Sequence, residues 1–238
     1  MTRSKMWALA GAAGALTLVL SACSGSATPG TTAGGGSGEK IKIGIKFDQP
    51  GLGLQEGNTF TGFDVEVAKY VANEMGYAEN QIEFVESQSA QRETMIQAEQ
   101  VKLIFATYSI TDSRKEKVSF GGPYFIAGQD LLVRTDDTSI TGPSTLEGKR
   151  LCSVTGSTPA QKIKNDYPGV ELVEYGTYSM CVSALESNGV DAVTTDNVIL
   201  AGFAAQPQYA GKLRVVGGLF TEERYGVGLK KGDIETCT

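Results

Sequence analysis

Predicted strands and helices alternate twice along this chain, and this alternation limits the fold more than any other feature. The first five strands are expected at 41–47, 81–86, 103–107, 129–134 and 150–154. Three more are expected at 170–174, 190–195 and 213–216. Helical periodicity occupies the segments between them, at 64–75, 91–97, 159–166, 177–187 and 197–205. Strands that alternate with helices are typical of parallel α/β sheets.

An extended connection at 118–129 separates the two series. The sequence therefore predicts an α/β protein of two lobes with a cleft between them. Ligands of such folds bind at the carboxyl ends of strands, where helix N-termini point. Segment 48–59 is rich in glycine and is expected to be a loop, and Asp64 is expected to cap the helix that follows.

The N-terminus has the pattern of a secretory signal. Arg3 and Lys5 precede an apolar run at 6–20, which is short for a membrane span and ends in small residues. Cys23 follows Leu-Ser-Ala, and this junction resembles the lipobox of bacterial lipoproteins, in which a diacylglyceryl group alkylates the cysteine. The alternatives are an ordinary export signal with an unrelated cysteine, or an uncleaved anchor helix. Residues 1–22 are thus predicted to be a lipoprotein signal peptide, and two acyl chains suffice for stable anchoring.

The composition changes directly after Cys23. Residues 24–38 are almost entirely Ser, Gly, Thr, Ala and Pro, without charge and without a large apolar side chain. Such a segment cannot bury enough surface to fold. We expect 23–39 to be a flexible, lipid-anchored tether with a reach of roughly 20 Å.

Composition also excludes several classes of function. The chain has 21 basic and 27 acidic residues and no basic run, which argues against nucleic acid as a partner. It contains no histidine, so Ser-His-Asp and Cys-His catalysis are excluded and a zinc site is not expected. We expect no metal and no cofactor. An acidic protein that binds an acidic ligand must concentrate its positive charge locally.

Three cysteines remain after Cys23, namely Cys152, Cys181 and Cys237. In an exported protein two of the three are expected to pair. Cys152 lies in a predicted strand, and Cys181 lies in the first turns of a predicted helix, with two elements between them and within one local unit. We therefore expect the Cys152–Cys181 disulfide, with Cys237 left over.

Two stretches resemble signatures of the family-3 extracellular solute-binding proteins. The first is Gly-Phe-Asp-Val-Glu-Val at 62–67, which opens the helix at 64–75. The second is Phe-Ala-Thr-Tyr-Ser-Ile-Thr-Asp-Ser-Arg at 105–114, followed by Val-Ser-Phe at 118–120 and Gly-Pro-Tyr at 122–124. The resemblance covers essentially the whole chain and is greatest to glutamate-binding lipoproteins of actinobacterial importers.

The resemblance implies a two-lobed, type II periplasmic-binding-protein fold with the ligand in the interdomain cleft. Lobe 1 would comprise 40–128 and 221–238, and lobe 2 would comprise 129–220. In the family a C-terminal helix packs on the first lobe, and its place would be after Thr238. The implied protein is a monomer on the outer face of the cell membrane that delivers an amino acid to an ABC transporter permease.

The resemblance also implies roles for the residues of the cleft. Arg114 would clamp the α-carboxylate of the ligand as a bidentate pair, helped by Thr107 and Ser109. Ser157 and Thr158 open a helix of the second lobe and would meet the same carboxylate. The acid that binds the α-ammonium would be Asp196. The plainer readings are that Arg114 belongs to a solvated charged run and that Ser157 only caps a helix.

The side chain of the ligand would be recognised by the remaining cations. Ser89 and Arg92 resemble the segment that faces the distal carboxylate in binders of acidic amino acids, and Lys46 ends the first strand where related binders also carry a base. Three converging cations (Lys46, Arg92 and Arg114) suit a dicarboxylate, so L-glutamate is the expected ligand. Aspartate and glutamine stay open.

An enzyme on the same fold is the alternative function, because some relatives are exported dehydratases of cyclohexadienyl or arogenate type. Such an enzyme needs a general acid beside the leaving group. The one aspartate expected in the pocket, Asp196, is already assigned to the ligand ammonium. We therefore expect a binding protein and not an enzyme.

Overall fold

A computed structural model describes residues 38–233 and 235–237 of the chain. The predicted signal peptide, Cys23 and the predicted tether up to Ser37 lie outside the described residues. Among the residues that are described, no helix is both long enough and apolar enough to cross a membrane.

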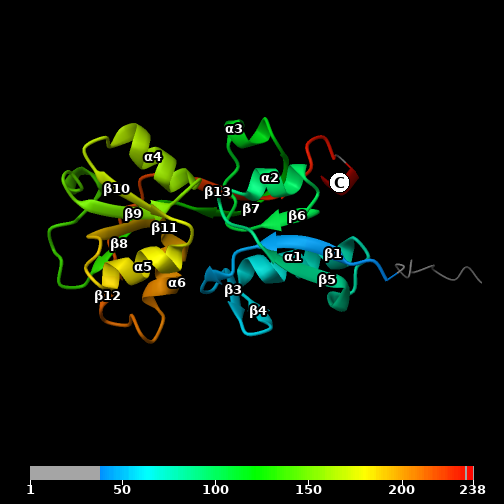
Figure 1. Cartoon of the computed structure of the whole chain (residues 1–238), viewed down its shortest axis with the longest axis horizontal. Coiled ribbons are helices and arrows are strands. Elements are labelled where there is room, and N and C mark those ends of the chain that lie inside the picture. The colour runs from blue at the N-terminus through cyan, green and yellow to red at the C-terminus, as the bar shows by residue number, and fades with distance from the viewer. Residues whose placement is uncertain (1–37, 234, 238) are drawn as a thin grey trace, which may run out of the picture. The chain divides into compact units, whose positions relative to one another are not determined.

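The first lobe is built around a five-stranded sheet in the order β5-β1-β6-β13-β7 (Figure 1). Its strands are β1 (Ile41–Ile45), β5 (Ile82–Glu86), β6 (Leu103–Phe105), β7 (Ser119–Ala127) and β13 (Glu223–Leu229). Strand β1 pairs in parallel with β5 and β6, whereas β13 runs antiparallel to β6 and β7. The sheet is therefore mixed, and the expectation of parallel pairing holds for its β5-β1-β6 part.

The two faces of this sheet bury different helices. Helix α1 (Phe63–Glu74) packs its Val65, Ala68 and Ala72 against the face that carries Ile43 and Phe105. Helix α2 (Arg92–Gln97) covers the opposite face, to which Ile104 and Ala106 belong. The alternation of side chains along β6 divides its residues between these two cores.

The second lobe is built around the sheet β10-β9-β11-β8-β12. Its strands are β8 (Gln129–Arg134), β9 (Arg150–Val154), β10 (Glu171–Tyr175), β11 (Ala192–Asp196) and β12 (Leu213–Val215). Strands β10, β9 and β11 are parallel, and β8 is antiparallel to β11 and β12.

Helices cover both faces of the second sheet as well. Helix α4 (Thr158–Asp166) packs through Ile163 on one face. Helices α5 (Tyr178–Glu186) and α6 (Asn197–Ala204) share the core on the other face, and Figure 1 shows α5 and α6 together on the side of the sheet away from α4.

The chain changes sheets twice. It leaves the first sheet at the end of β7 and enters the second with β8, only Gly128 lying between them. It returns between β12 and β13. Strand β13 contains residues expected in the first lobe but was not predicted as a strand, and it pairs with both β6 and β7.

The segment predicted as a loop at 48–59 is not irregular. It contains β2 (Asp48–Gln49) and β3 (Gly53–Glu56), and with β4 (Thr59–Thr61) these form a small antiparallel sheet. The turn between β3 and β4 uses Gly57 at φ 60°, a left-handed conformation that glycine adopts without strain. The glycines therefore mark tight turns between short strands.

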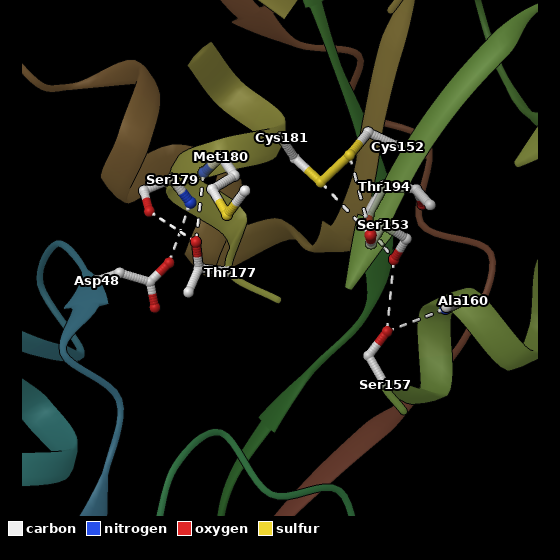
Figure 2. The surroundings of a disulfide bond; sticks show 10 residues. All are labelled: Asp48, Cys152, Ser153, Ser157, Ala160, Thr177, Ser179, Met180, Cys181 and Thr194. Atoms are coloured by element: carbon white, nitrogen blue, oxygen red, sulfur yellow. Dashed lines mark hydrogen bonds between the residues drawn. A yellow bond between two sulfur atoms is a disulfide. The ribbon is translucent and has the colours of Figure 1, made fainter. Parts of the chain in front are cut away.

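A disulfide joins Cys152 on β9 to Cys181 on α5, with the Cα atoms 5.5 Å apart. Figure 2 shows the bond at the N-terminal end of α5. At the same helix end, the backbone N–H of Ser179 donates to Asp48 Oδ2 over 3.0 Å, and Asp48 belongs to the first lobe. The disulfide thus anchors to β9 a helix end that carries one of the contacts between the lobes.

Candidate ligand-binding site

The nine residues predicted to bind the ligand lie at or just beyond the carboxyl ends of strands. Lys46 follows β1, Asp196 ends β11, and the others follow β5, β6 or β9: Ser89, Arg92, Thr107, Ser109, Arg114, Ser157 and Thr158. All are buried except Thr158, which is half-buried. Since charged side chains are rarely buried without partners, their partners define what the site can do.

Arg114 has partners on both lobes. It lies in the short helix α3 (Asp112–Lys115), which the Thr111 hydroxyl caps. Its Nη1 donates to the Ser109 carbonyl over 2.7 Å, and its Nη2 donates to the Gly156 carbonyl of the second lobe over 3.2 Å. Its Nε lies 3.4 Å from Glu93 Oε1. The guanidinium is therefore held in one plane where the lobes meet, which rules out the reading as a solvated charge.

Arg92 is buried, with only 2% of its surface exposed. Its Nη1 donates to the Ala106 carbonyl over 3.0 Å, and its Cζ lies 4.2 Å from the centre of the Tyr108 ring. Burial, with a further contribution from Arg114, lowers the pKa of Arg92 to about 10. The side chain is still a cation at neutral pH.

Lys46 shares this cationic environment. Its Nζ donates to Ser89 Oγ over 2.9 Å. Burial and the positive charge of Arg92 lower the pKa of Lys46 to about 7, against partial compensation from Asp48 and Glu86. An anion placed beside Lys46 would favour the charged ammonium.

Asp196 is the buried anion of the site. The Tyr225 hydroxyl of β13 donates to its Oδ2 over 2.5 Å. Burial and the nearby Glu223 raise the pKa of Asp196 to about 7, while Tyr225, Arg114 and Arg92 oppose this rise. A ligand cation beside Asp196 would favour the ionised carboxylate.

Two of these charged groups keep a buried polar atom without a partner among the described residues. They are Nε of Arg92, a donor, and Oδ1 of Asp196, an acceptor. Leaving such a group unmatched costs about 1–3 kcal/mol, and more where it is charged. A ligand with an acceptor group and an ammonium would satisfy both atoms.

The hydroxyls of Ser157, Thr158 and Ser109 contact other groups of the protein. Ser157 accepts from the N–H of Ala160 over 3.1 Å, so its side chain is the N-cap of α4. Thr158 Oγ1 donates to Glu223 Oε2 over 2.9 Å and lies 3.3 Å from Ser109 Oγ. These contacts join α4 of the second lobe to β13 and to the Ser109 loop of the first.

Thr107 is also engaged in a way that the sequence did not predict. Its hydroxyl lies 2.7 Å from the Ala106 carbonyl and 3.2 Å from Gln49 Oε1. Its backbone has φ 46°, a left-handed conformation that costs a non-glycine residue about 1–2 kcal/mol. The side chain supports the loop that carries Ser109, and a direct role at the ligand remains a proposal.

The expectation that Asp64 caps α1 is wrong. The N-cap position is Gly62, and no side chain caps the helix there. Asp64 is fully buried and accepts from the Thr107 N–H over 2.7 Å and from the Tyr124 hydroxyl over 2.8 Å. Its carboxylate holds the strained Thr107 backbone in place, because the loop offers a buried N–H that needs an acceptor.

A polar cleft of about 810 Å³ opens beside the Arg114 clamp. Its lining comes from both lobes and includes Ser89, Glu93, Arg114, Ser157, Thr158 and Glu223. Four of the nine predicted residues thus border this cleft, Ser89 and Arg114 from the first lobe and Ser157 and Thr158 from the second. The other five are not part of its lining, namely Lys46, Arg92, Thr107, Ser109 and Asp196. Within the described part of the chain, no cluster of acidic residues or cysteines could hold a metal ion.

Several residues of the site were missed by sequence reasoning. Tyr108 lies under two arginines, Glu93 contacts Arg114, Tyr225 and Glu223 come from β13, and Gln49 contacts Thr107. Tyr108 stands inside the 105–114 motif, so its position was visible but its orientation was not. The two residues of β13 carry no local signal, because only the return of the chain to the first sheet brings them to the cleft.

Two mixed sheets joined by two crossings, with buried charges of both signs where they meet, define a two-lobed solute-binding protein. The model of bacterial extracellular solute-binding proteins, family 3, matches residues 41–236, and the chain belongs to this family. It is therefore an extracytoplasmic solute-binding protein.

Relatives and solved structures agree with this assignment. The glutamate-binding protein GluB of Corynebacterium glutamicum is 47% identical over 98% of this chain and 82% of its own length. A glutamine-binding protein of Geobacillus stearothermophilus is 36% identical over 90% of this chain and 83% of its own length. An ancestral arginine-binding protein bound to glutamine superposes with a TM-score of 0.77 at 31% identity, covering 82% of this chain and 86% of that one. The type II fold expected from the resemblance is thereby confirmed.

Proposed function

We propose that this protein captures L-glutamate outside the cell and delivers it to the permease of an ABC transporter. The observation that carries the proposal is the charge of the site. Three basic side chains, Lys46, Arg92 and Arg114, are at least nine-tenths buried. The buried carboxyl of Asp196 interacts electrostatically with the two arginines. A zwitterionic amino acid with a second carboxylate supplies the missing negative charge.

Each charge of glutamate has a partner in this arrangement. The α-carboxylate meets Arg114, whose guanidinium is already oriented by Glu93 and the Ser109 carbonyl. The α-ammonium meets the unpaired Oδ1 of Asp196. The distal carboxylate meets the unpaired Nε of Arg92 and the ammonium of Lys46, with Ser89 beside it. Charge-assisted hydrogen bonds of this kind are about twice as strong as neutral ones.

The relatives support the same class of ligand. The relative from Corynebacterium glutamicum is named for glutamate, and the more distant one from Geobacillus stearothermophilus for glutamine. These two amino acids share the α-carboxylate and α-ammonium and differ only at the distal group. Arg92 and Lys46 therefore determine which of the two amino acids binds more tightly. Their positive charge favours the distal carboxylate of glutamate over the amide of glutamine.

The attachment to the membrane is part of the proposal. The lipobox-like junction at Cys23 and the uncharged segment after it favour a lipid anchor with a flexible tether. A tether allows the lobes to sample ligand and to approach the permease without moving the anchor.

Calorimetric titration of the soluble protein, without its signal and with Cys23 replaced by serine, tests the proposal. Glutamate should bind in the micromolar range or tighter, with aspartate and glutamine at least about tenfold weaker. Binding of glutamine in preference to glutamate would overturn the assignment of the ligand. Binding of none of the three would overturn the proposed class of ligand.

A further inference from the structure

Two arginines of the site lie over one aromatic ring. The Cζ atom of Arg92 is 4.2 Å from the centre of the Tyr108 ring, and that of Arg114 is 5.0 Å from the same centre. Both distances lie within the range of cation–π attraction, which is strongest where the groups are removed from water. Tyr108 is fully buried, and the two guanidinium groups are at least nine-tenths buried.

The surrounding core holds the ring itself in place. Phe120 packs edge-on against it with ring centres 4.8 Å apart. The backbone of Gly228 on β13 approaches so closely that an added Cβ would lie 2.6 Å from Tyr108 Cε1. The hydroxyl donates to Glu93 Oε1 over 2.7 Å. The ring is thus fixed on its edges and at its tip, and its position is set by the core of the first lobe.

Without the ring, the two arginines would be expected to move apart. Like charges repel most strongly where little water screens them. Glu93 Oε1 lies 3.4 Å from Nε of Arg114, and the Glu93 charge also stabilises the cation of Arg92. Attraction to a common ring therefore adds to the hydrogen bonds that the guanidinium groups donate, from Arg92 to the Ala106 carbonyl and from Arg114 to the Ser109 and Gly156 carbonyls. The ring is the one contact in this set that the two cations share.

We propose that Tyr108 is a positioning residue that sets the spacing of Arg92 and Arg114 to fit the two carboxylates of one ligand, a step that rests on the proposed function. Arg114 contributes to binding of any α-amino acid, because every such ligand has the α-carboxylate. Arg92 distinguishes a distal carboxylate from a distal amide. Loss of the ring should therefore weaken binding of glutamate more than binding of glutamine, and the ratio of the two affinities reports the role of Tyr108.

Titration of Tyr108→Phe and Tyr108→Leu with glutamate and with glutamine tests this inference. Phenylalanine keeps the aromatic face and loses only the hydroxyl, so both affinities should stay within about threefold of wild type. Leucine removes the aromatic face, so the affinity for glutamate should fall about thirtyfold and the affinity for glutamine only about fivefold. Thermal unfolding of each variant shows that it is folded before titration.

A general loss of structure would lower both affinities alike and leave their ratio unchanged, which separates a purely structural role from the proposed one. If Tyr108→Leu does not fold, Tyr108→Met fills more of the volume with a flexible side chain that also lacks an aromatic face. It should narrow the ratio in the same way.

An unchanged ratio in a folded variant without the ring would overturn the inference. The inference would also be overturned if Tyr108→Phe lost as much affinity for glutamate as Tyr108→Leu, since the loss would then come from the hydroxyl and not from the ring. A wild-type protein without preference for glutamate would overturn the proposed function first. The two failures are therefore distinguishable.

Discussion

The hydroxyl of Tyr225 on β13 donates to Oδ2 of Asp196 on β11 over 2.5 Å, and this bond joins the two lobes. It also favours the ionised form of Asp196 against the effect of burial, which raises the pKa of that carboxyl to about 7. Asp196 is the residue proposed to bind the ligand ammonium. The Tyr225 hydroxyl from the other lobe thus keeps the pKa of this carboxyl from rising further.

Tyr225→Phe should make binding more sensitive to acid. Loss of the hydroxyl raises the pKa of Asp196 above about 7, so a larger fraction is protonated in the free protein at neutral pH. Binding of the ammonium then requires release of a proton, and affinity falls as pH decreases. We expect about threefold to tenfold weaker binding at pH 7, largely recovered at pH 8. Titrations at pH 6, 7 and 8 measure it, and a pH-independent loss would contradict this role of Tyr225.

Lys46 should produce the opposite limb of the pH profile. In the free protein its pKa is about 7 because of burial and Arg92, and a ligand carboxylate raises it. Binding therefore takes up a proton above pH 7, and the affinity for glutamate should weaken by about tenfold between pH 7 and 8.5. Lys46→Met should bind more weakly at pH 7 but show no such weakening at higher pH. An unchanged alkaline limb in this variant would assign the titration to another group.

Arg114→Ala should abolish useful binding. A ligand carboxylate buried without its partner costs about 3–5 kcal/mol, or about two to three and a half decades in dissociation constant. Arg114→Lys should recover only part of this, because lysine cannot reproduce the planar fork that contacts Glu93 and Ser109. Binding of Arg114→Ala within threefold of wild type would place the clamp elsewhere.

The fold could be predicted where the pattern is local. The alternation of apolar and polar residues at 41–47 predicted strand β1, and the helical periodicity at 64–75 predicted helix α1, and both elements contribute to one core. Strand β13 could not be found in this way, because its pairing with β6 joins residues more than a hundred positions apart. The 48–59 segment was misread because its strands are only two to four residues long.

For the candidate site, the burial of the predicted residues agrees with the sequence analysis, and their role at the ligand stays a prediction. The sequence motif pointed to Arg114, which lies in α3 and borders the cleft, and to Asp196, which is buried at the end of β11. It could not reveal that Asp64 holds the Thr107 backbone or that Tyr108 underlies two arginines. Those roles depend on side-chain directions in the packed core, which spacing along the chain does not specify.

Cys23→Ser should release the protein into the medium without a change in ligand affinity. The serine hydroxyl cannot accept the thioether-linked diacylglyceryl group, and the tether separates the anchor from the site. Fractionation of cells that express the variant measures the release. Cys237→Ser is the matched control and should stay with the membrane. A Cys23→Ser protein that remains membrane-bound would contradict the lipid anchor.

The preference for glutamate over glutamine in Arg92→Gln tests the central claim most directly. If Arg92 and Lys46 meet a distal carboxylate, the wild-type protein should prefer glutamate, since the amide leaves buried cations without a counter-charge. Removing the guanidinium should weaken the binding of glutamate far more than the binding of glutamine. The preference for glutamate over glutamine should therefore become smaller or reverse. Lys46→Met should do the same to a smaller degree, because its ammonium is a mobile point charge. Competition titrations of Arg92→Gln with both amino acids give the result. We predict that affinity for glutamate falls much more than affinity for glutamine. Equal losses of affinity for the two ligands would contradict the assignment of Arg92 to a distal carboxylate.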